Sequence, residues 1–441
     1  MLLSFLKKSH KKLQEKENIP PIKVIVTDAN EISMLPFMEI IAQALRQTPL
    51  FIVGTQKEQS SENFLNSENK NFFDFLDSGL KILKKYQADV LIRIYQEKNN
   101  IRLNFQTENM YFKKVPPFLS LVDSLYLPIS FFQQKDLPKE ISTLIASTIV
   151  ALNIKKDERY GIYLKNLVEI LSKSAPKKNF DTDTIPHLLN FLAFNYMSAN
   201  EAHFEKRDVK LALSLVHAAY QKKTSGLNSL LEGTLLTTLG QIYQCALTGK
   251  NANNYVLIQC AIESYKKAQK HFNRYVFPYD YARLSLVLSK LYFQFFKLSD
   301  DTQTLRDAIF QLREAEKIVT QTLFPEYWAK IQHELGLYLA LLSTKSNNET
   351  IAKLAIQNFQ NEQRFYSLEN TPERWAEIEE EIAETYDHLG KHTLDTTHFE
   401  KAIEHYGNAF DVFAKLNQEQ RCKEIELYVQ RLEEELAQIE K

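Results

Sequence analysis

Hydrophobic and polar positions change their period repeatedly along the first third of the chain. The run IKVIVT, from Ile22 to Thr27, is β-branched and is bounded by prolines and by Asp-Ala-Asn, which predicts a buried strand. Helical spacing follows in MLPFMEIIAQALRQ, a second strand in LFIVG and a second amphipathic helix in NFFDFLDSGLKILKKY. This alternation predicts helices packed on a sheet.

The remainder of this segment predicts a hairpin, a last strand and a closing helix. Two strand-like runs in ADVLIRIYQEKNNIRLNFQTE meet at Lys98, Asn99 and Asn100, where asparagine tolerates the left-handed backbone of a tight turn. SLYLPISFF supplies the last strand and DLPKEISTLIASTIVALN the helix. We therefore expect an α/β domain over residues 21–155, with the order β-α-β-α-β-β-(β)-α in a mixed sheet.

The C-terminal two-thirds of the chain repeat one helical pattern. Pro278, Pro325 and Pro372 stand 47 residues apart, and an aromatic residue and an alanine follow three and four positions after each. A large-small-large set comes at offsets ten, eleven and fourteen, and a second set rich in alanine at thirty, thirty-four and thirty-seven. Evenly spaced helix pairs are typical of a solenoid, because one pair cannot bury its apolar face alone.

These positions resemble the tetratricopeptide repeat (TPR), in which Leu-Gly-x-x-Tyr is followed by Ala-x-x-x-Phe and a closing proline. Two features depart from the family: the period is 47, and Glu362 replaces the last alanine in one unit. We expect the extra length in a longer first helix and in a longer connection such as LGKHTLDTTHFEK. Because Thr-Pro-x-x-Trp-Ala opens the last unit, the chain is similar to a long-repeat bacterial branch of the family.

Two weaker units extend the array toward the N-terminus. The expected organisation is then a basic tail (residues 1–20), the α/β domain, a connecting helix and linker (156–180), about five TPR-like helix pairs (181–420) and a polar capping helix (421–441). The α/β domain resembles, in its order of elements alone, the N-terminal domain of the Tol-Pal translocation protein. That resemblance implies a protein-contacting role without catalysis.

The TPR resemblance implies a concave groove lined by the first helix of each pair. By analogy with the family's groove positions, the predicted partner-binding residues are Arg283, Lys290, Phe293, Lys330, His333, Glu377, Glu380 and Glu384. A groove that is basic and apolar in its middle and acidic at its end suits an extended or helical peptide with the opposite charge order. The alternative, that these stripes are merely solvated helix faces, stays open. The family's carboxylate clamp of lysines and asparagines is missing at matching positions, so a free C-terminal carboxylate is not the implied ligand.

Composition narrows the class of protein. Apolar residues make up 44% and charged residues 25%, and the formal charge of −1 argues against a general nucleic-acid binder. From Glu373 onward there are 18 acidic and 8 basic residues, so the two ends of the chain should prefer different partners. No apolar run reaches the length of about 18 residues that a transmembrane helix needs, and MLLSFLKKSHKK falls short of a secretory signal. Three scattered cysteines fit a reducing compartment, and we expect a cytoplasmic protein.

Motifs for catalysis or cofactors have little support. The α/β domain contains only Gly54 and Gly79, too few for a glycine-rich phosphate cradle. His388 and His392 have a spacing that can hold zinc, but no glutamate completes an H-E-x-x-H motif, and neutral surface histidines are the commoner case. The sequence therefore predicts no catalytic residues, no cofactor and no metal.

Two functions follow as hypotheses. The first is a non-catalytic scaffold or adaptor that binds a peptide or helix of another protein, with the α/β domain as a second binding surface or as a dimer contact in a homo-oligomer. The second is a small-molecule or nucleotide sensor, or an enzyme, that uses a cleft in the α/β domain.

Overall fold

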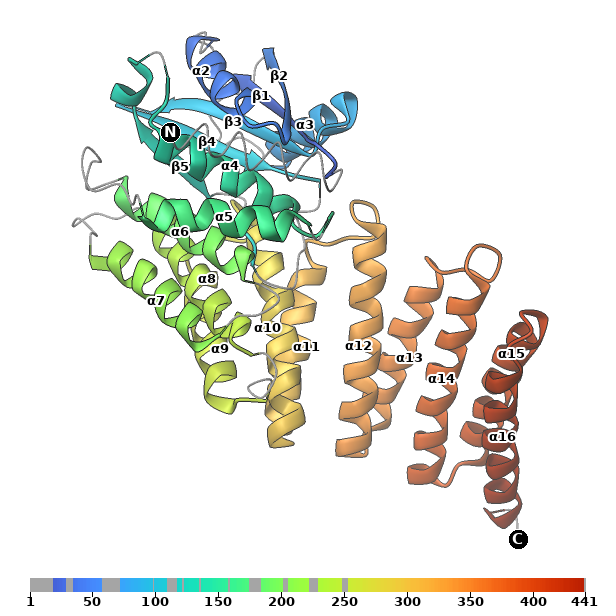
Figure 1. Ribbon diagram of the computed structural model, residues 1–441. Helices are drawn as coiled ribbons and strands as arrows, with labels where there is room; N and C mark the ends of the chain where they lie inside the picture. The colour runs from blue at the N-terminus through green and yellow to red at the C-terminus, as the bar shows by residue number, and fades with distance from the viewer. Residues whose placement is uncertain are drawn as a thin grey trace. The chain divides into compact units, whose positions relative to one another are not determined.

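The computed structural model describes residues 19–28, 35–57, 72–97, 99–108, 117–120, 123–134, 136–157, 159–173, 184–200, 205–221, 229–247 and 253–439 (Figure 1). Most of the predicted basic tail and of the predicted linker lies outside these residues. The chain divides into two compact units, Met1–Leu284 and Ser285–Lys441. The division falls inside helix α10 (Pro278–Ser299).

A five-stranded mixed sheet lies in the first unit. Its strands stand in the order β2-β1-β3-β4-β5. Strand β1 pairs in parallel with β2 and β3, whereas β4 is antiparallel to both β3 and β5. The strands are β1 (Ile22–Asp28), β2 (Phe51–Lys57), β3 (Val90–Glu97), β4 (Asn100–Gln106) and β5 (Ser124–Pro128). The predicted α/β fold with a mixed sheet is confirmed.

The hairpin of β3 and β4 brings polar residues onto one buried face. Glu97 pairs with Asn100 beside the turn, at the predicted place. Arg93 pairs with Asn104 in the same ladder, and both side chains are buried. Because neighbouring residues of β3 on the opposite face are apolar and also buried, both faces of this strand are covered.

Helices pack on the sheet. Helix α2 (Leu35–Arg46) contacts β1 and β2, and α3 (Phe72–Tyr86) contacts β3. A Cβ added at Gly79 in α3 would lie 1.9 Å from Gln106 Oε1, the same oxygen that accepts a 2.8 Å hydrogen bond from Arg93 Nη1. Gly79 therefore permits close approach of α3 to the polar face of the sheet, a packing role that needs no phosphate ligand. A short 3-10 helix, η2 (Ile129–Phe132), and helix α4 (Lys139–Asn153) follow β5.

The connecting helix and the first two helix pairs also belong to the first unit. The connecting helix is α5 (Arg159–Lys173), and the pairs are α6 (Ile185–Ala199) with α7 (Lys206–Gln221) and α8 (Ser229–Cys245) with α9 (Tyr255–Gln269). Helix α6 packs on α7 and on β5, and α8 packs on α9. At the small position that the repeat pattern predicts, a Cβ on Gly240 would lie 2.9 Å from the ring of Tyr265. The pattern thus identified a real helix-helix contact.

The second unit is a run of antiparallel helices (Figure 1). Besides the end of α10 it contains α11 (Thr302–Glu316), α12 (Pro325–Ser346), α13 (Glu349–Gln363), α14 (Pro372–Thr393), α15 (Thr396–Lys415) and α16 (Glu419–Ile439). Helices α10, α12 and α14 each begin at a repeated proline and are 22 residues long. Long first helices and a helical repeat array are therefore confirmed.

The turn between the two helices of a pair has the same backbone conformation at the same position in three units. Asp300, Asn347 and Leu394 have positive φ angles of 52°, 48° and 56°. The following residues, Asp301, Asn348 and Asp395, cap the second helices by accepting backbone N–H groups. The predicted longer connection in LGKHTLDTTHFEK was wrong, because α14 extends to Thr393 and the cap starts α15 at Thr396.

Small residues and a terminal helix complete the packing. Ala308, Ala355 and Ala402 are fully buried in the second helices, as the repeat pattern predicts. Helix α16 contacts α15 and buries Ile425 and Leu432, while most of its remaining surface is charged and exposed. Across the described ranges, every helix is too short or too polar to cross a bilayer.

Candidate functional site

Arg283 lies inside the first unit rather than on an exposed groove face. Its side chain is 1% exposed, its Nη1 donates to Leu119 O at 2.8 Å, and its Nη2 donates to Asp280 Oδ1 at 2.6 Å. The guanidinium carbon also lies 4.5 Å from the ring centroid of Phe118. The prediction that Arg283 faces a partner is corrected, because a loop 164 positions earlier in the chain covers it.

The same buried network continues toward β5. Ser120 donates its hydroxyl to Asp280 Oδ1 at 2.7 Å and its backbone N–H to Asp123 Oδ2 at 2.8 Å. Burial raises the pKa of Asp123 to about 7, and the neighbouring charge of Asp280 adds to the rise. The side-chain amide of Gln241 on α8 makes two hydrogen bonds with the backbone of Phe118. Its Oε1 accepts from the Phe118 N–H at 2.7 Å, and its Nε2 donates to the Phe118 carbonyl at 2.8 Å. These residues fasten the loop before β5 to the helices, which is a structural role.

Three other predicted groove residues lie at the surface of the second unit. Lys290 on α10 and Lys330 on α12 are exposed. Phe293 is half-buried, and its ring stacks on Tyr338 with centroids 4.2 Å apart. Lys330 forms a 2.5 Å ion pair with Glu326 one turn earlier, an exposed pair of small energetic value. Lys290 and Lys330 are thus accessible and Phe293 is partly so, whereas Arg283 of the same stripe is not.

The capping helix covers part of the predicted acidic end. Glu380 is 9% exposed and forms an ion pair with Arg421 of α16. Asp387, one turn beyond Glu384, accepts a 2.6 Å hydrogen bond from Arg431 of the same helix. Glu384 itself remains accessible to solvent, and partial desolvation together with the nearby acidic side chains raises its pKa. The expectation that Glu380 lines an open groove is corrected, because Glu380 is nearly buried and is paired with Arg421 of α16.

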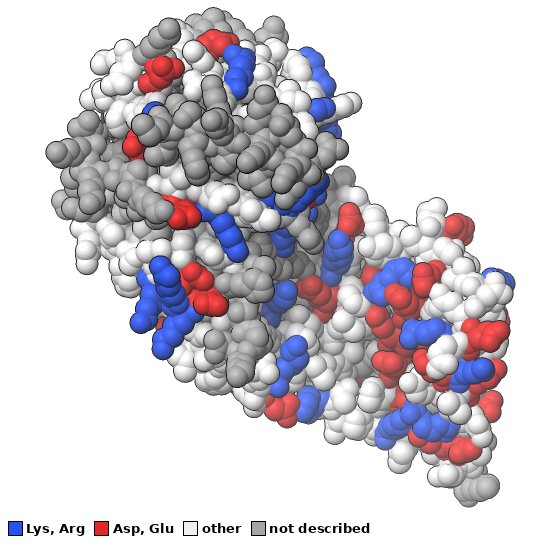
Figure 2. All heavy atoms as spheres, viewed as in Figure 1, with Lys and Arg blue, Asp and Glu red and all other residues white. Residues whose placement is uncertain are grey.

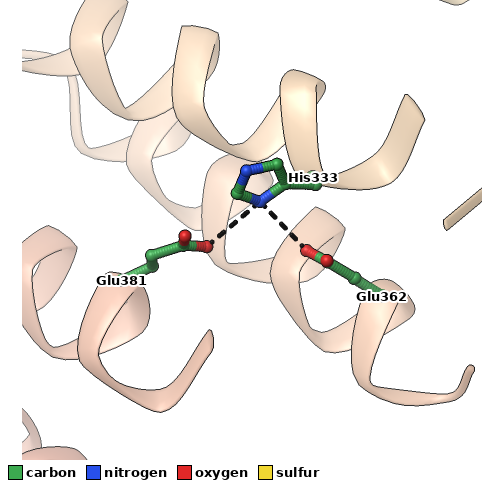
Figure 3. A group of neighbouring side chains, drawn as sticks. All are labelled: His333, Glu362 and Glu381. Atoms are coloured by element: carbon green, nitrogen blue, oxygen red, sulfur yellow. Dashed lines mark ion pairs between the residues drawn. The ribbon is translucent and has the colours of Figure 1, made fainter. Parts of the chain in front are cut away.

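His333, Glu362 and Glu381 form a compact polar cluster, called here the triad (Figure 3). The residues come from α12, α13 and α14 respectively. His333 Nδ1 lies 3.2 Å from Glu362 Oε2 and 3.3 Å from Glu381 Oε2. The Glu362 side chain is 2% exposed, whereas those of His333 and Glu381 are 26% and 20% exposed. The triad is therefore half-open to solvent over a buried carboxylate.

Arg374 on α14 joins the triad from its side. Its Nη2 lies 2.9 Å from Glu362 Oε1 and 2.8 Å from His333 Nδ1, and its Nη1 donates to Glu377 Oε2 at 2.7 Å. Glu377, a predicted groove residue, is therefore engaged in an ion pair along its own helix. Arg374 thus adds a second cation beside Glu362 and Glu381, the two carboxylates that contact His333.

The carboxylates change the titration of His333. Burial by itself would lower its pKa, but Glu362 and Glu381 outweigh this effect and raise the pKa to about 9. The two carboxylates thereby favour the protonated imidazole at neutral pH, although a second cation, Arg374, also lies beside His333. A shared charge cluster that spans three helices couples two consecutive helix pairs.

The triad was only partly visible in the sequence. His333 is one of the predicted groove residues. Glu362 occupies the offset at which the neighbouring units have alanine. Glu381 and Arg374 escaped the prediction, because the acidic stretch EIEEEIAE gives no sign of which carboxylate turns toward α12. An acidic residue at a position normally reserved for a small buried one was the available signal.

The histidines considered for zinc lie elsewhere in the second unit. His388 and His392 line a cavity of about 180 Å³ together with residues of the α12–α13 turn, among them Asn348 and Glu349. Burial lowers the pKa of His388. The cavity is smaller than the usual range of about 300–1,000 Å³ for small-molecule sites. The prediction of no metal ligation at these two histidines stays a prediction.

Charges of both signs are interspersed over the second unit (Figure 2). The visible face of the repeat helices carries lysine and arginine beside aspartate and glutamate, rather than one segregated patch. The ion pairs Lys345–Asp300, Lys353–Glu349 and Lys391–Asp387 are examples of this arrangement. A mixed surface favours specific local contacts over general attraction to a polyanion.

Comparisons with known proteins do not name a family. No family model matches the chain, and no curated protein matches it. Among solved structures, BtubC (BKLC) from P. vanneervenii is 16% identical, with 59% of this chain and 92% of that chain covered and a TM-score of 0.37. A STAND protein with a tetratricopeptide repeat sensor from Pyrococcus horikoshii is 12% identical, with 96% of this chain and 72% of that chain covered and a TM-score of 0.36. A circular tandem repeat protein is 13% identical, with 68% and 85% covered and a TM-score of 0.27. Likenesses at these TM-scores carry no argument about function.

Proposed function

We propose that the chain is a non-catalytic scaffold or adaptor whose TPR-like helix pairs bind a peptide or helix of another protein. The observation that carries the proposal is the accessible row on α10 and α12. Lys290, Lys330 and Leu337 are exposed there, with the half-buried Phe293 between them. Helical repeats that stack one pair on the next present such rows as extended binding surfaces.

The chemistry of this row favours a segment that is acidic and apolar. Two lysines supply positive charge, and Leu337 together with the Phe293–Tyr338 stack supplies apolar area. An amphipathic helix or extended peptide with carboxylates beside a large apolar side chain would satisfy both. Because α16 already neutralises Glu380, we place the contact on α10 and α12 rather than at the acidic end.

Site-specific photo-cross-linking tests the proposal. A photoreactive amino acid is placed at Leu337 on the first helix of a pair, or at Leu354 on the second helix as a matched control, since the two are 39% and 41% exposed. We expect a cross-link from position 337 to one defined segment of a partner, identified by mass spectrometry, and none to that segment from position 354. Equal labelling from both positions would reject this surface.

Charge reversal provides a second test. Lys330→Glu and Lys353→Glu both break an exposed ion pair one helical turn long, but only Lys330 lies on the first helix. We expect Lys330→Glu, alone or with Lys290→Glu, to weaken capture of the segment found by cross-linking, and Lys353→Glu to leave it unchanged. Both variants should keep the circular dichroism spectrum of the parent protein, because surface changes of this kind cost little stability.

A further inference from the structure

The strongest unexplained feature of the second unit is the convergence of three ligand-type atoms in the triad. His333 Nδ1, Glu362 Oε2 and Glu381 Oε2 lie within 4.8 Å of one another. Glu362 is 1% exposed, and apart from the contacts of His333 Nδ1 itself, no described donor makes a hydrogen bond to its Oε2 or to Oε2 of Glu381. Buried oxygens of this kind normally have a partner, so the arrangement points to a cation.

A proton cannot satisfy these three atoms together. If Nδ1 carries a hydrogen, that hydrogen can point well at only one carboxylate, and Nδ1 then opposes the N–H of Arg374, 2.8 Å away. If Nδ1 carries none, it can accept from Arg374, but both carboxylate oxygens then lack a donor. A metal ion placed between the three atoms would bind all of them at once.

Two of the three ligand separations fit a transition metal without rearrangement of the helices. Two ligand atoms that are each about 2.0–2.1 Å from a tetrahedral Zn²⁺ lie about 3.3–3.4 Å apart. The separations of His333 Nδ1 from the two carboxylate oxygens are 3.2 Å and 3.3 Å. Half-exposed side chains of His333 and Glu381 leave room for water to complete the coordination.

The donor set narrows the class of ion. One imidazole nitrogen with two carboxylates is a borderline set that suits Zn²⁺ and its neighbours in the first transition row. Calcium needs six to eight oxygen ligands, and magnesium retains most of its water and is held chiefly by carboxylates and phosphates. A site with three protein ligands from three helices is therefore best matched by Zn²⁺.

Arg374 is compatible with a bound metal, because it can position one of the ligating carboxylates. Its guanidinium holds Glu362 Oε1, which leaves Oε2 directed at His333. Its Nη2 must move away from Nδ1 when the ion enters, and Nη1 can keep its bond to Glu377 while it does so. Such hydrogen bonds to ligating carboxylates are a usual feature of metal sites.

We propose that His333, Glu362 and Glu381 bind a divalent transition-metal ion, best matched by Zn²⁺, which ties α12 and α13 to α14. The ion bridges two consecutive helix pairs and thereby stiffens the array. His333 lies on the same face of α12 as Lys330 and Leu337, but metal binding and partner cross-linking are measured separately, so a failure of one proposal can be told from a failure of the other.

The experiment uses the full chain without a histidine tag, freed of metal with a chelator and then titrated with Zn²⁺. Bound metal is measured by elemental analysis after gel filtration and by calorimetry. Co²⁺ is then used as a coloured substitute, because its visible absorption reports coordination number and ligands. We expect one equivalent of Zn²⁺ and a cobalt spectrum typical of low coordination with nitrogen and oxygen ligands.

Matched variants locate the ion. His333→Ala, Glu362→Gln and Glu381→Gln should each weaken binding by at least about tenfold, since each removes a ligand. Glu377→Gln, which also alters a partner of Arg374, and the double variant His388→Ala/His392→Ala should each retain one equivalent. Glu381→Gln is the decisive variant if the change at buried Glu362 lowers folding, because Glu381 is partly exposed.

Two results would overturn the proposal. The first is no stoichiometric binding by the folded, metal-free parent protein at Zn²⁺ concentrations well above those of a specific site. The second is an equivalent of metal that survives in all three triad variants or disappears in the His388/His392 variant. Loss of partner cross-linking at Leu337 would leave the metal site unaffected.

Discussion

Gly336 on α12 lies against the ring of Phe359 on α13, so closely that a Cβ at position 336 would come within 2.4 Å of that ring. The two residues occupy offsets eleven and thirty-four of one repeat unit, the small and the large position of a helix pair. Phe359 is 1% exposed. The contact sets how near the two helices of the pair can approach.

Gly336→Ala should therefore destabilise the second unit. Overpacking of a buried contact typically costs about 1–3 kcal/mol, which outweighs the gain of about 0.5–1 kcal/mol from replacing a helical glycine. Gly407→Ala is the matched control, because Gly407 also lies in a helix but nothing lies within 4 Å of an added Cβ. The free energy of unfolding in urea should fall for Gly336→Ala and rise for Gly407→Ala. Equal stabilisation by both would contradict the tight contact.

Arg283→Met should destabilise the first unit strongly. Removing this guanidinium leaves Asp280 buried without its ion-pair partner, at a typical cost of about 3–5 kcal/mol. Arg313→Met breaks an ion pair with Glu316 whose side chains are 37% and 26% exposed, and should cost less than about 1 kcal/mol. The free energy of unfolding in urea measures both. A small change in the free energy of unfolding for Arg283→Met would mean that the buried network contributes little to stability.

Stability of the metal-free protein should depend on pH through His333. Its pKa is about 9 in the folded protein, against 6.5 for an unperturbed histidine, so the stabilisation is fully present below pH 6.5 and is lost as the pH rises through 9. The loss should be of the order of 1–2 kcal/mol once screening at this partly exposed site is allowed for.

His333→Gln isolates this effect. Other groups titrate in both proteins, so the difference between their two stability profiles reports His333 alone. The parent protein should lose its advantage between pH 6.5 and 9, whereas the variant should not. Parallel profiles over this range would show that the two carboxylates do not hold a protonated imidazole.

Thermal shift separates the scaffold proposal from a nucleotide sensor or enzyme. With ATP, GTP or NAD at about 1 mM, we expect no saturable change in the melting temperature of the full chain. A site filled at about a hundred times its Kd would add about 2.7 kcal/mol and be easily detected. A specific, saturable rise with one nucleotide would favour the α/β domain as a ligand site and reject the non-catalytic assignment.

The helical and strand elements followed closely from local pattern. IKVIVT, the hairpin at Asn99 and the prolines at positions 278, 325 and 372 each begin or lie in the element that they predict. Such signals depend on residues within one or two turns, which backbone sterics and the burial of one face govern directly. The short cap at Asp395 was overlooked, because a residue with positive φ at Leu394 is unusual for leucine.

The exposure of the predicted groove residues was predicted less well. The positions of residues on one helix face do not indicate which other segment packs against that face. Arg283 and Lys290 belong to the same stripe of α10, yet a loop covers the first and solvent surrounds the second. Glu380 is covered by Arg421, a residue of the capping helix. Exposure depends on contacts between segments far apart in the sequence, which no local period encodes.

Amino-acid order alone determined the period of 47 residues, the pairing of small with large positions and the mixed α/β domain, since each rests on local spacing and size. Tertiary packing decided which charged side chains lie next to one another. It brought His333, Glu362 and Glu381 from three helices to a single point and buried Arg283 beneath a distant loop. The physical reason is that a charge acts through space, at distances set by the folded chain and by the solvent that folding removes.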